Sequence, residues 1–387
     1  MDFKSAATDG RWVSTDADEA NQDKANEVST SRLKLKQALT EILLSENLVV
    51  LAGLGTSLHV TDGNDKPVAP SMSDLWAAVE QASGKGFEGI KSSVCYRSPG
   101  DRDDIELLLS QCQMAERFSP SKAVNEFMAR AESLIVEKCR FVTESTKLGG
   151  HESFLRKAAR RSTRLPRLRL FTTNYDLCFE AAASHVRFVA VDGFSHTQPQ
   201  EFDGLHFSYD FVRRGHDREA PEYIPNVFHL YKLHGSVDWE LKGTQVVKTL
   251  QPQKPLIIYP RYSKFESSYD QPFLEMMSRF QLSLRQPNTG LLVIGVGFKD
   301  HHISQPVMSA VRANVGLKAA IVSPSLKKKG NENASIATVN SLIEKGDWRL
   351  TLIASTFEHL VSFLPDLVAE TEEELYRQRV RSVGETK

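Results

Sequence analysis

An amide and an imidazole each stand just past an apolar, strand-like run of this sequence. Asn174 follows the run 168–172, and His234 follows the run 228–233. Ligands of open α/β sheets bind beyond the carboxyl ends of the strands, so both side chains are expected to face one crevice. An imidazole near neutral pH can take a proton from a positioned hydroxyl or water. The pair is therefore a candidate catalytic centre, and the alternative for His234 is a buried structural histidine.

A glycine loop follows the first apolar run of the chain, residues 48–52. Glycines directly after a buried strand let the backbone turn sharply and bring its N–H groups close to a pyrophosphate. The dinucleotide fingerprint G-x-G-x-x-G is incomplete, because Leu58 takes the place of the third glycine. A tight strand-to-helix turn without any ligand is the alternative. The residues expected to hold phosphates are Gly53, Gly55, Thr56 and Ser57.

Four short motifs occur in a fixed order along the chain. They are G-x-G-x-S from Gly53, T-x-N-x-D from Thr172, K-L-H-G-S from Lys232 and G-x-G-F-x-D from Gly295. Together these motifs resemble the sirtuin family, specifically its bacterial sirtuin-like branch of antiphage defence. That branch is favoured by Trp239, the run 297–303 and the segment 104–108. The resemblance spans about residues 48–325.

The resemblance implies an NAD+ hydrolase that releases nicotinamide and ADP-ribose, with NAD as its substrate. Asn174 would then fix a ribose hydroxyl or the attacking water, and His234 would be the general base. Asp176 would anchor the nicotinamide carboxamide. The remaining contacts would come from Gly295 and Gly297 beside the ribose or phosphate and from Ser323 beside the adenosine half.

Two other functions stay open, a non-catalytic sensor of NAD or ADP-ribose and an NAD-dependent protein deacylase. A pure sensor would not need an amide and a base placed together, which favours the enzyme. Protein-deacylating sirtuins carry a four-cysteine zinc module, whereas no C-x-x-C pair occurs here and no zinc is expected. Thr173 also replaces the usual glutamine of the motif, and Gly297 stands where a serine is common. The four cysteines are Cys95, Cys112, Cys139 and Cys178.

The adjacent His301 and His302, with Asp300 before them, could be taken for metal ligands. Neighbouring histidines in a strand-to-helix turn point in different directions, and a third ligand at suitable spacing is missing nearby. We therefore expect no metal. Asp300 fits better as a residue that interacts with free N–H groups at a helix N-terminus.

Composition argues against nucleic acid and membranes as general partners. The 387 residues include 48 basic and 49 acidic side chains, so the chain has no overall field that would attract nucleic acid or a membrane surface. Apolar stretches stay far short of the roughly 20 residues of a membrane span. A basic run over 156–169 could bind phosphate or RNA, or form a solvated helix face, and is left unassigned. The expected location is a reduced bacterial cytoplasm.

The pattern of runs predicts an α/β fold with a doubly wound, Rossmann-like parallel sheet. Helical periodicity over about residues 74–165 predicts a helical insert in this sheet. Residues 1–30 read as a mobile N-terminal arm, 31–369 as the sirtuin-like domain and 370–387 as a charged tail. The resemblance further implies a homo-oligomer that associates with a HerA-type hexameric ATPase.

Overall fold

The computed structural model describes residues 1–16, 22–98, 103–214, 222–259, 271–328 and 333–367. Within these ranges, nine strands form the central sheet. In sheet order they are β2 (Val13–Ser14), β1 (Asp2–Ser5), β15 (Leu350–Ala354), β14 (Lys318–Val322), β13 (Thr289–Ile294), β3 (Asn47–Ala52), β4 (Arg169–Thr172), β9 (Val227–Lys232) and β5 (Val189–Val191). The strands from β15 to β5 run parallel, and β1 and β2 are antiparallel additions at one edge.

The parallel strands are continuous apolar runs because helices cover both faces of the sheet. In β3, Leu48, Val50 and Ala52 point to one layer of helices. Val49 and Leu51 point to the other layer. All five side chains are buried, so a single strand contributes to two cores.

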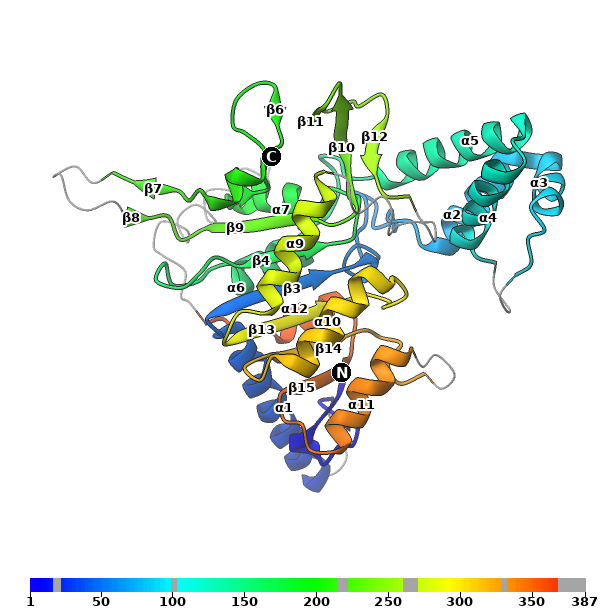
Figure 1. Ribbon diagram of the computed structural model, residues 1–387. Coiled ribbons are helices and arrows are strands. Elements are labelled where there is room, and N and C mark those ends of the chain that lie inside the picture. The colour runs from blue at the N-terminus through cyan, green and yellow to red at the C-terminus, as the bar shows by residue number, and fades with distance from the viewer. Residues whose placement is uncertain (17–21, 99–102, 215–221, 260–270, 329–332, 368–387) are drawn as a thin grey trace.

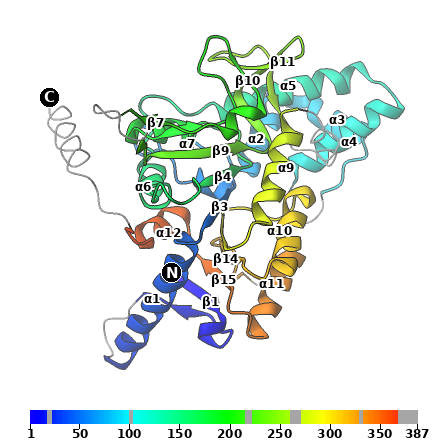
Figure 2. The same ribbon diagram turned by 60° about the vertical axis from the view of Figure 1, so that its left-hand side comes forward.

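Two helical layers enclose the sheet (Figures 1 and 2). One core joins the sheet to α1 (Gln22–Leu43), α6 (Gly149–Ala158), α7 (Cys178–Val186) and α12 (Phe357–Phe363). The other core joins it to α9 (Phe273–Leu284), α10 (His301–Ala313) and α11 (Ala334–Glu344). Arg161 and Lys157, from the basic run near α6, donate to backbone carbonyls of the protein itself.

The strand order reverses direction at β3. The chain passes from β3 to β4 and onward to one side of the sheet, then returns to β13 on the other side. This arrangement is a doubly wound parallel sheet, which confirms the fold class predicted from the sequence. Its topological switch point lies between β3 and β13, where such sheets bind ligands.

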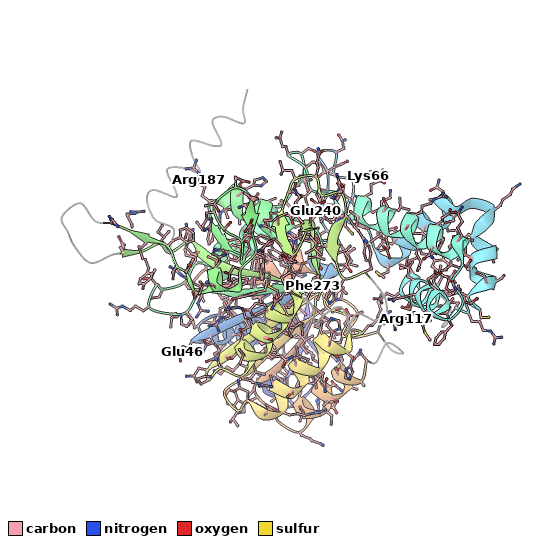
Figure 3. All side chains as sticks on the ribbon, turned by 45° about the horizontal axis from the view of Figure 1, so that its top comes forward. Glu46, Lys66, Arg117, Arg187, Glu240 and Phe273 are labelled. Carbon is pink, nitrogen blue, oxygen red and sulfur yellow. The ribbon has the colours of Figure 1, made fainter. Side chains whose placement is uncertain are left out.

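Four helices protrude from the sheet between β3 and β4 (Figure 1). They are α2 (Met72–Ser83), α3 (Phe87–Ser93), α4 (Ile105–Phe118) and α5 (Lys122–Cys139). They enclose a core of their own, which also contacts Tyr175, Leu177 and Val237 next to the strand ends. Figure 3 shows Arg117 of this projection well apart from Glu46 and Phe273 on the body. Helix α6 comes before β4 as well but packs on the sheet, so only α2–α5 form the projection.

The N-terminal segment differs from the expected mobile arm. Asp2–Ser5 pairs in register with β15, and Phe3 is 1% exposed in the main core. Helix α1 begins at Gln22, nine residues before the expected start of the domain at Ser31. The strand signal in the sequence is weak here, because β1 has one large apolar side chain in four residues. The predicted charged tail, 370–387, lies outside the described residues.

A smaller antiparallel sheet lies beyond the carboxyl ends of the main strands (Figure 1). Its strands are β12 (Pro255–Ile257), β10 (Gly235–Lys242), β11 (Gln245–Lys248) and β6 (Gln200–Glu201). A short ribbon pairs β7 (Val212–Arg213) with β8 (Glu222–Tyr223). Among the described helices, none is long and apolar enough to cross a membrane.

Candidate functional site

The predicted site residues come from the carboxyl ends of five adjacent strands. β14, β13, β3, β4 and β9 are neighbours in the sheet, and each is followed by predicted residues. Thr172 pairs with Lys232 in the β4–β9 register, so Asn174 and His234 stand two residues beyond the same level of neighbouring strands. Because paired strands lie about 4.8 Å apart, both residues belong to one edge of the sheet.

Asn174 is fixed by three contacts on the glycine loop. Its amide nitrogen lies 3.1 Å from the carbonyl oxygen of Gly53, 3.2 Å from Thr56 Oγ1 and 3.0 Å from Ser57 Oγ. A backbone carbonyl can only accept, so the nitrogen of the side chain must face the loop. Within the described residues, no group donates to Asn174 Oδ1. The amide therefore presents its oxygen as the acceptor for a further hydroxyl or water.

Ser57 connects the amide to a buried carboxylate. The Ser57 hydroxyl donates to Asp176 Oδ2 at 2.8 Å. The other oxygen, Asp176 Oδ1, accepts the backbone N–H of Cys178 at the start of α7, at 3.0 Å. Both carboxylate oxygens thus have partners inside the protein. Asp176 orders the loop and the helix start, and its predicted contact with a carboxamide stays a prediction.

Lys232, which the sequence prediction did not assign, supports the same turn from behind. Its ammonium group is buried and donates to the backbone carbonyls of Tyr175 and Asp176 and to Glu180 Oε1 at 3.0 Å. Burial raises the pKa of Glu180, and the charge of Lys232 opposes that rise. A lysine between the apolar Tyr231 and Leu233 was the signal in the sequence, because a buried lysine needs partners.

Tyr175 holds the turn from the other side. Its hydroxyl donates to the backbone carbonyl of Ile258 at 2.5 Å, and its own carbonyl accepts the N–H of Val237 at 3.1 Å. Burial raises the pKa of Tyr175 well above its ordinary value, so the phenol stays neutral and can donate. The Asn174 turn is therefore clamped between the main sheet and the smaller sheet.

His234 is buried at the junction of these two sheets and contacts a second histidine. Its Nε2 lies 2.8 Å from Nε2 of His302, the second residue of α10. Its backbone carbonyl accepts the N–H of Ile258 at 2.8 Å. The next residue, Gly235, has φ +82°, and a Cβ there would lie 2.2 Å from the Leu256 carbonyl oxygen. Gly235 thus allows β10 to approach β12 closely.

The two glycine loops touch each other at the switch point. A Cβ on Gly55 would lie 2.6 Å from the Cα of Gly295, whose φ is +65°. The N–H groups of Gly53 and Gly55 donate to the carbonyls of Ile294 and Gly295. These glycines therefore let two strand ends approach closely. Their predicted phosphate contacts stay predictions, because both N–H groups have partners in this structure.

The remaining predicted residues lie farther along this edge. Gly297 has open space where a side chain would be. Ser323 follows β14, and its hydroxyl lies 3.0 Å from that of Ser325. Neither residue is bonded to the Asn174 cluster. Asp300 occupies the N-cap position of α10, where its backbone carbonyl accepts two helical N–H groups, but its side chain makes no capping bond.

Metal-binding groups are not gathered in the described part of the chain, where no cluster of three or more His, Cys, Asp or Glu side chains could hold an ion. Of the cysteines, Cys95 is exposed and the other three are buried. Burial raises the pKa of Cys139 to about 12, so this thiol stays protonated near neutral pH.

Part of the chain, including several residues of the candidate site, matches a known protein family. Residues 168–341 match the family described as SIR2-like domain. The match covers less than half of the chain, and it includes Asn174, His234 and His302. No curated protein matches the chain. A solved structure titled "Structural Basis for the Mechanism and Regulation of Sir2 Enzymes" aligns with 90% of this chain and 99% of its own, at 12% identity and a TM-score of 0.39, which is a loose overlap.

Proposed function

We propose that this protein hydrolyses NAD+ at the crevice above β4 and β9, releasing nicotinamide and ADP-ribose. The observation that carries the proposal is the fixed Asn174 amide, whose oxygen is the available acceptor, one strand away from the buried His234. The SIR2-like match over the segment that contains both residues supports it. NAD would enter as a substrate, and no metal takes part in the proposal.

The chemistry needs few groups. The bond between nicotinamide and ribose is activated because its leaving group is a cationic pyridinium, so a crevice that orients the ribose and a water supplies most of what is required. Asn174 Oδ1 would accept from the water or from a ribose hydroxyl. His234 would take the proton as the water oxygen bonds to the anomeric carbon and nicotinamide leaves with the bond electrons.

The decisive experiment measures nicotinamide release by the purified protein and by two variants, Asn174→Ala and His234→Ala. Loss of a positioned base or orienting amide should lower kcat by ~10²–10⁴. His301→Ala and Asn340→Ala serve as matched controls, because His301 is exposed and Asn340 bonds to Glu344 on α11. If both site variants fold and release nicotinamide at the unmodified rate, the site is wrong. Binding of NAD without cleavage by the unmodified protein would instead support a nucleotide sensor.

The proposal extends to the biological role. Hydrolysis would deplete NAD in an infected bacterium and so limit phage growth, as the resemblance to antiphage sirtuin-like proteins implies. Such an activity must be restrained, and we propose that it works in a homo-oligomer that binds a HerA-type hexameric ATPase. Light scattering of the protein alone and with such an ATPase tests the assembly. A stable monomer that is unchanged by the ATPase would contradict it.

A further inference from the structure

Two histidines that lie 68 residues apart in the sequence meet at the candidate site. Nε2 of His234 and Nε2 of His302 are 2.8 Å apart, which is a hydrogen-bond distance. His234 is 3% exposed and His302 is 9% exposed, so water has little access to this contact. Their ring centroids are 5.0 Å apart, with planes tilted by 37°, so the rings meet through their nitrogens rather than by stacking.

The distance restricts the hydrogens on the two rings. If both Nε2 atoms carried hydrogen, the hydrogens would collide, so one nitrogen donates and the other accepts. A neutral imidazole carries one ring hydrogen. If His234 accepted at Nε2, its hydrogen would sit on Nδ1 and both of its nitrogens would be occupied. His234 can act as a base beside this partner only if its Nε2 donates to His302 and its Nδ1 is bare.

We propose that His302 is a positioning residue for His234, which it orients in the crevice and holds in the tautomer with hydrogen on Nε2. This role rests on the NAD+ hydrolysis proposed above. When His234 takes a proton at Nδ1 from a water or a ribose hydroxyl, the ring becomes an imidazolium. Its Nε2–H then donates a charge-assisted hydrogen bond to the bare Nε2 of His302. His302 thereby stabilises the charge that forms on His234.

The local structure explains how His302 is delivered. Gly295 and Phe298 both have positive φ values, +65° and +54°, so the chain after β13 turns sharply before α10 begins. His302 is the second residue of that helix, and the neighbouring Ile303 is buried in the core that α10 shares with the sheet. A residue in the first turn of a packed helix is held more rigidly than one in a loop.

The kinetic test compares His302→Leu, His302→Gln and a matched control, His301→Leu, which makes the same change at the exposed neighbour. His302→Leu should lower kcat for nicotinamide release by about 10- to 100-fold while KM changes by less than about 2-fold, because an orienting partner of the base acts on the chemical step. His302→Gln should recover much of kcat, since its amide oxygen can accept near the Nε2 position. His301→Leu should keep the unmodified kcat. A folded His302→Leu variant with unmodified kcat, or an equal loss in His301→Leu, would overturn the proposal.

A second measurement does not depend on activity. The ¹⁵N chemical shifts of the histidine rings, recorded at a pH where the rings are neutral, separate nitrogens that carry hydrogen from bare ones. In the unmodified protein, His234 should show hydrogen on Nε2 and none on Nδ1. His302→Gln should preserve this state, His301→Leu should not change it, and His302→Leu should give a mixture of tautomers.

The two readouts separate the two proposals. If the unmodified protein releases no nicotinamide but the ring nitrogens behave as expected, NAD+ hydrolysis fails while the tautomer assignment stands. If nicotinamide is released but Nε2 of His234 is bare, the positioning role of His302 fails. If His302→Leu does not fold, the kinetics of His302→Gln and the ring ¹⁵N shifts of the unmodified protein still test the positioning role of His302.

Discussion

At the scale of single residues, Asn174 differs from an ordinary strand-end amide because acceptors on three neighbouring residues fix its orientation. Ser57 is central to that arrangement, since it accepts from Asn174 and donates to Asp176. A hydroxyl that links two polar side chains restricts both of them, so its loss should be felt in binding and in the chemical step.

Ser57→Ala is therefore expected to raise KM for NAD and lower kcat, each by several-fold but less than the loss in Asn174→Ala. The stability cost should be about 1 to 3 kcal/mol, because a buried hydroxyl and its two partners lose hydrogen bonds. Steady-state kinetics and thermal unfolding measure the two effects. Ser73→Ala, at an exposed position on α2, is the control. Unchanged kinetics in a folded Ser57→Ala variant would contradict the role given to this hydroxyl.

His151 shows the opposite situation, a polar ring without partners. It is fully buried against His59, Phe179 and Phe357, and neither ring nitrogen has a hydrogen-bond partner among the described residues. Burial, with a smaller contribution from His59, lowers the pKa of His151 from 6.5 to about 3. The unfolded chain therefore binds a proton below about pH 6.5 that the folded protein does not bind.

The stability of the fold should consequently fall as the pH drops from about 6.5 toward 3. For His151 alone the loss between pH 7 and pH 5 is about 2 kcal/mol by proton linkage. His151→Leu should remove this part of the pH dependence, whereas His359→Leu, on the exposed side of α12, should not. Denaturant unfolding at the two pH values measures it. An unchanged pH dependence in His151→Leu would show that His151 is not the titrating group.

At the scale of elements, the site depends on the approach of β10 to β12 directly after His234. Gly243, in the β10–β11 turn, also has a positive φ, +64°, but a Cβ there would meet nothing within 4 Å. Gly235 combines its positive φ with a backbone contact. Substituting the two glycines therefore distinguishes the free-energy cost of a left-handed backbone from the cost of a steric clash.

Gly243→Ala should cost about 1 kcal/mol, the usual penalty for a left-handed non-glycine residue. Gly235→Ala should cost several kcal/mol more, because the new methyl group would strike the Leu256 carbonyl and push β12 away. Nicotinamide release should also fall in Gly235→Ala, since the His234 carbonyl is hydrogen-bonded to Ile258, directly after the displaced β12. Equal unfolding midpoints for the two variants would argue against the tight β10–β12 contact.

The sequence predicted the elements that are buried on both faces better than those that are not. β3, β4 and β9 were found because two helical layers require continuous apolar runs. β1 was missed because Phe3 is its one large apolar side chain and its partner strand is remote. The contact between His234 and His302 and the anchoring by Lys232 join residues far apart in the sequence. The local pattern around Lys232 signals a buried lysine, but no local pattern identifies the partners of Lys232 or of His234.

At the scale of the whole molecule, the first strand is part of the main core. Phe3 is 1% exposed and packs with helix and strand residues of that core. Phe3→Ala should destabilise the fold by about 3 to 5 kcal/mol through the lost burial and the cavity left behind. Phe118→Ala, which removes a ring that is 84% exposed, should change stability by less than about 0.5 kcal/mol. Urea unfolding distinguishes them, and equal midpoints would restore the mobile-arm interpretation.

The pairing of β1 with β15 also has a consequence for the order of events during synthesis. Asp2 lies opposite Ala354, so β1 meets its partner β15 only after roughly 350 further residues have been made. Until then, β1 can pair only with β2, where Phe3 lies opposite Val13, while β3, β4 and β9 can already pair with one another. Closing this edge is a contact of very high sequence separation, which is slow to form. The growing chain must therefore keep the β15-facing edge of β1 open until residues 350–354 have been made.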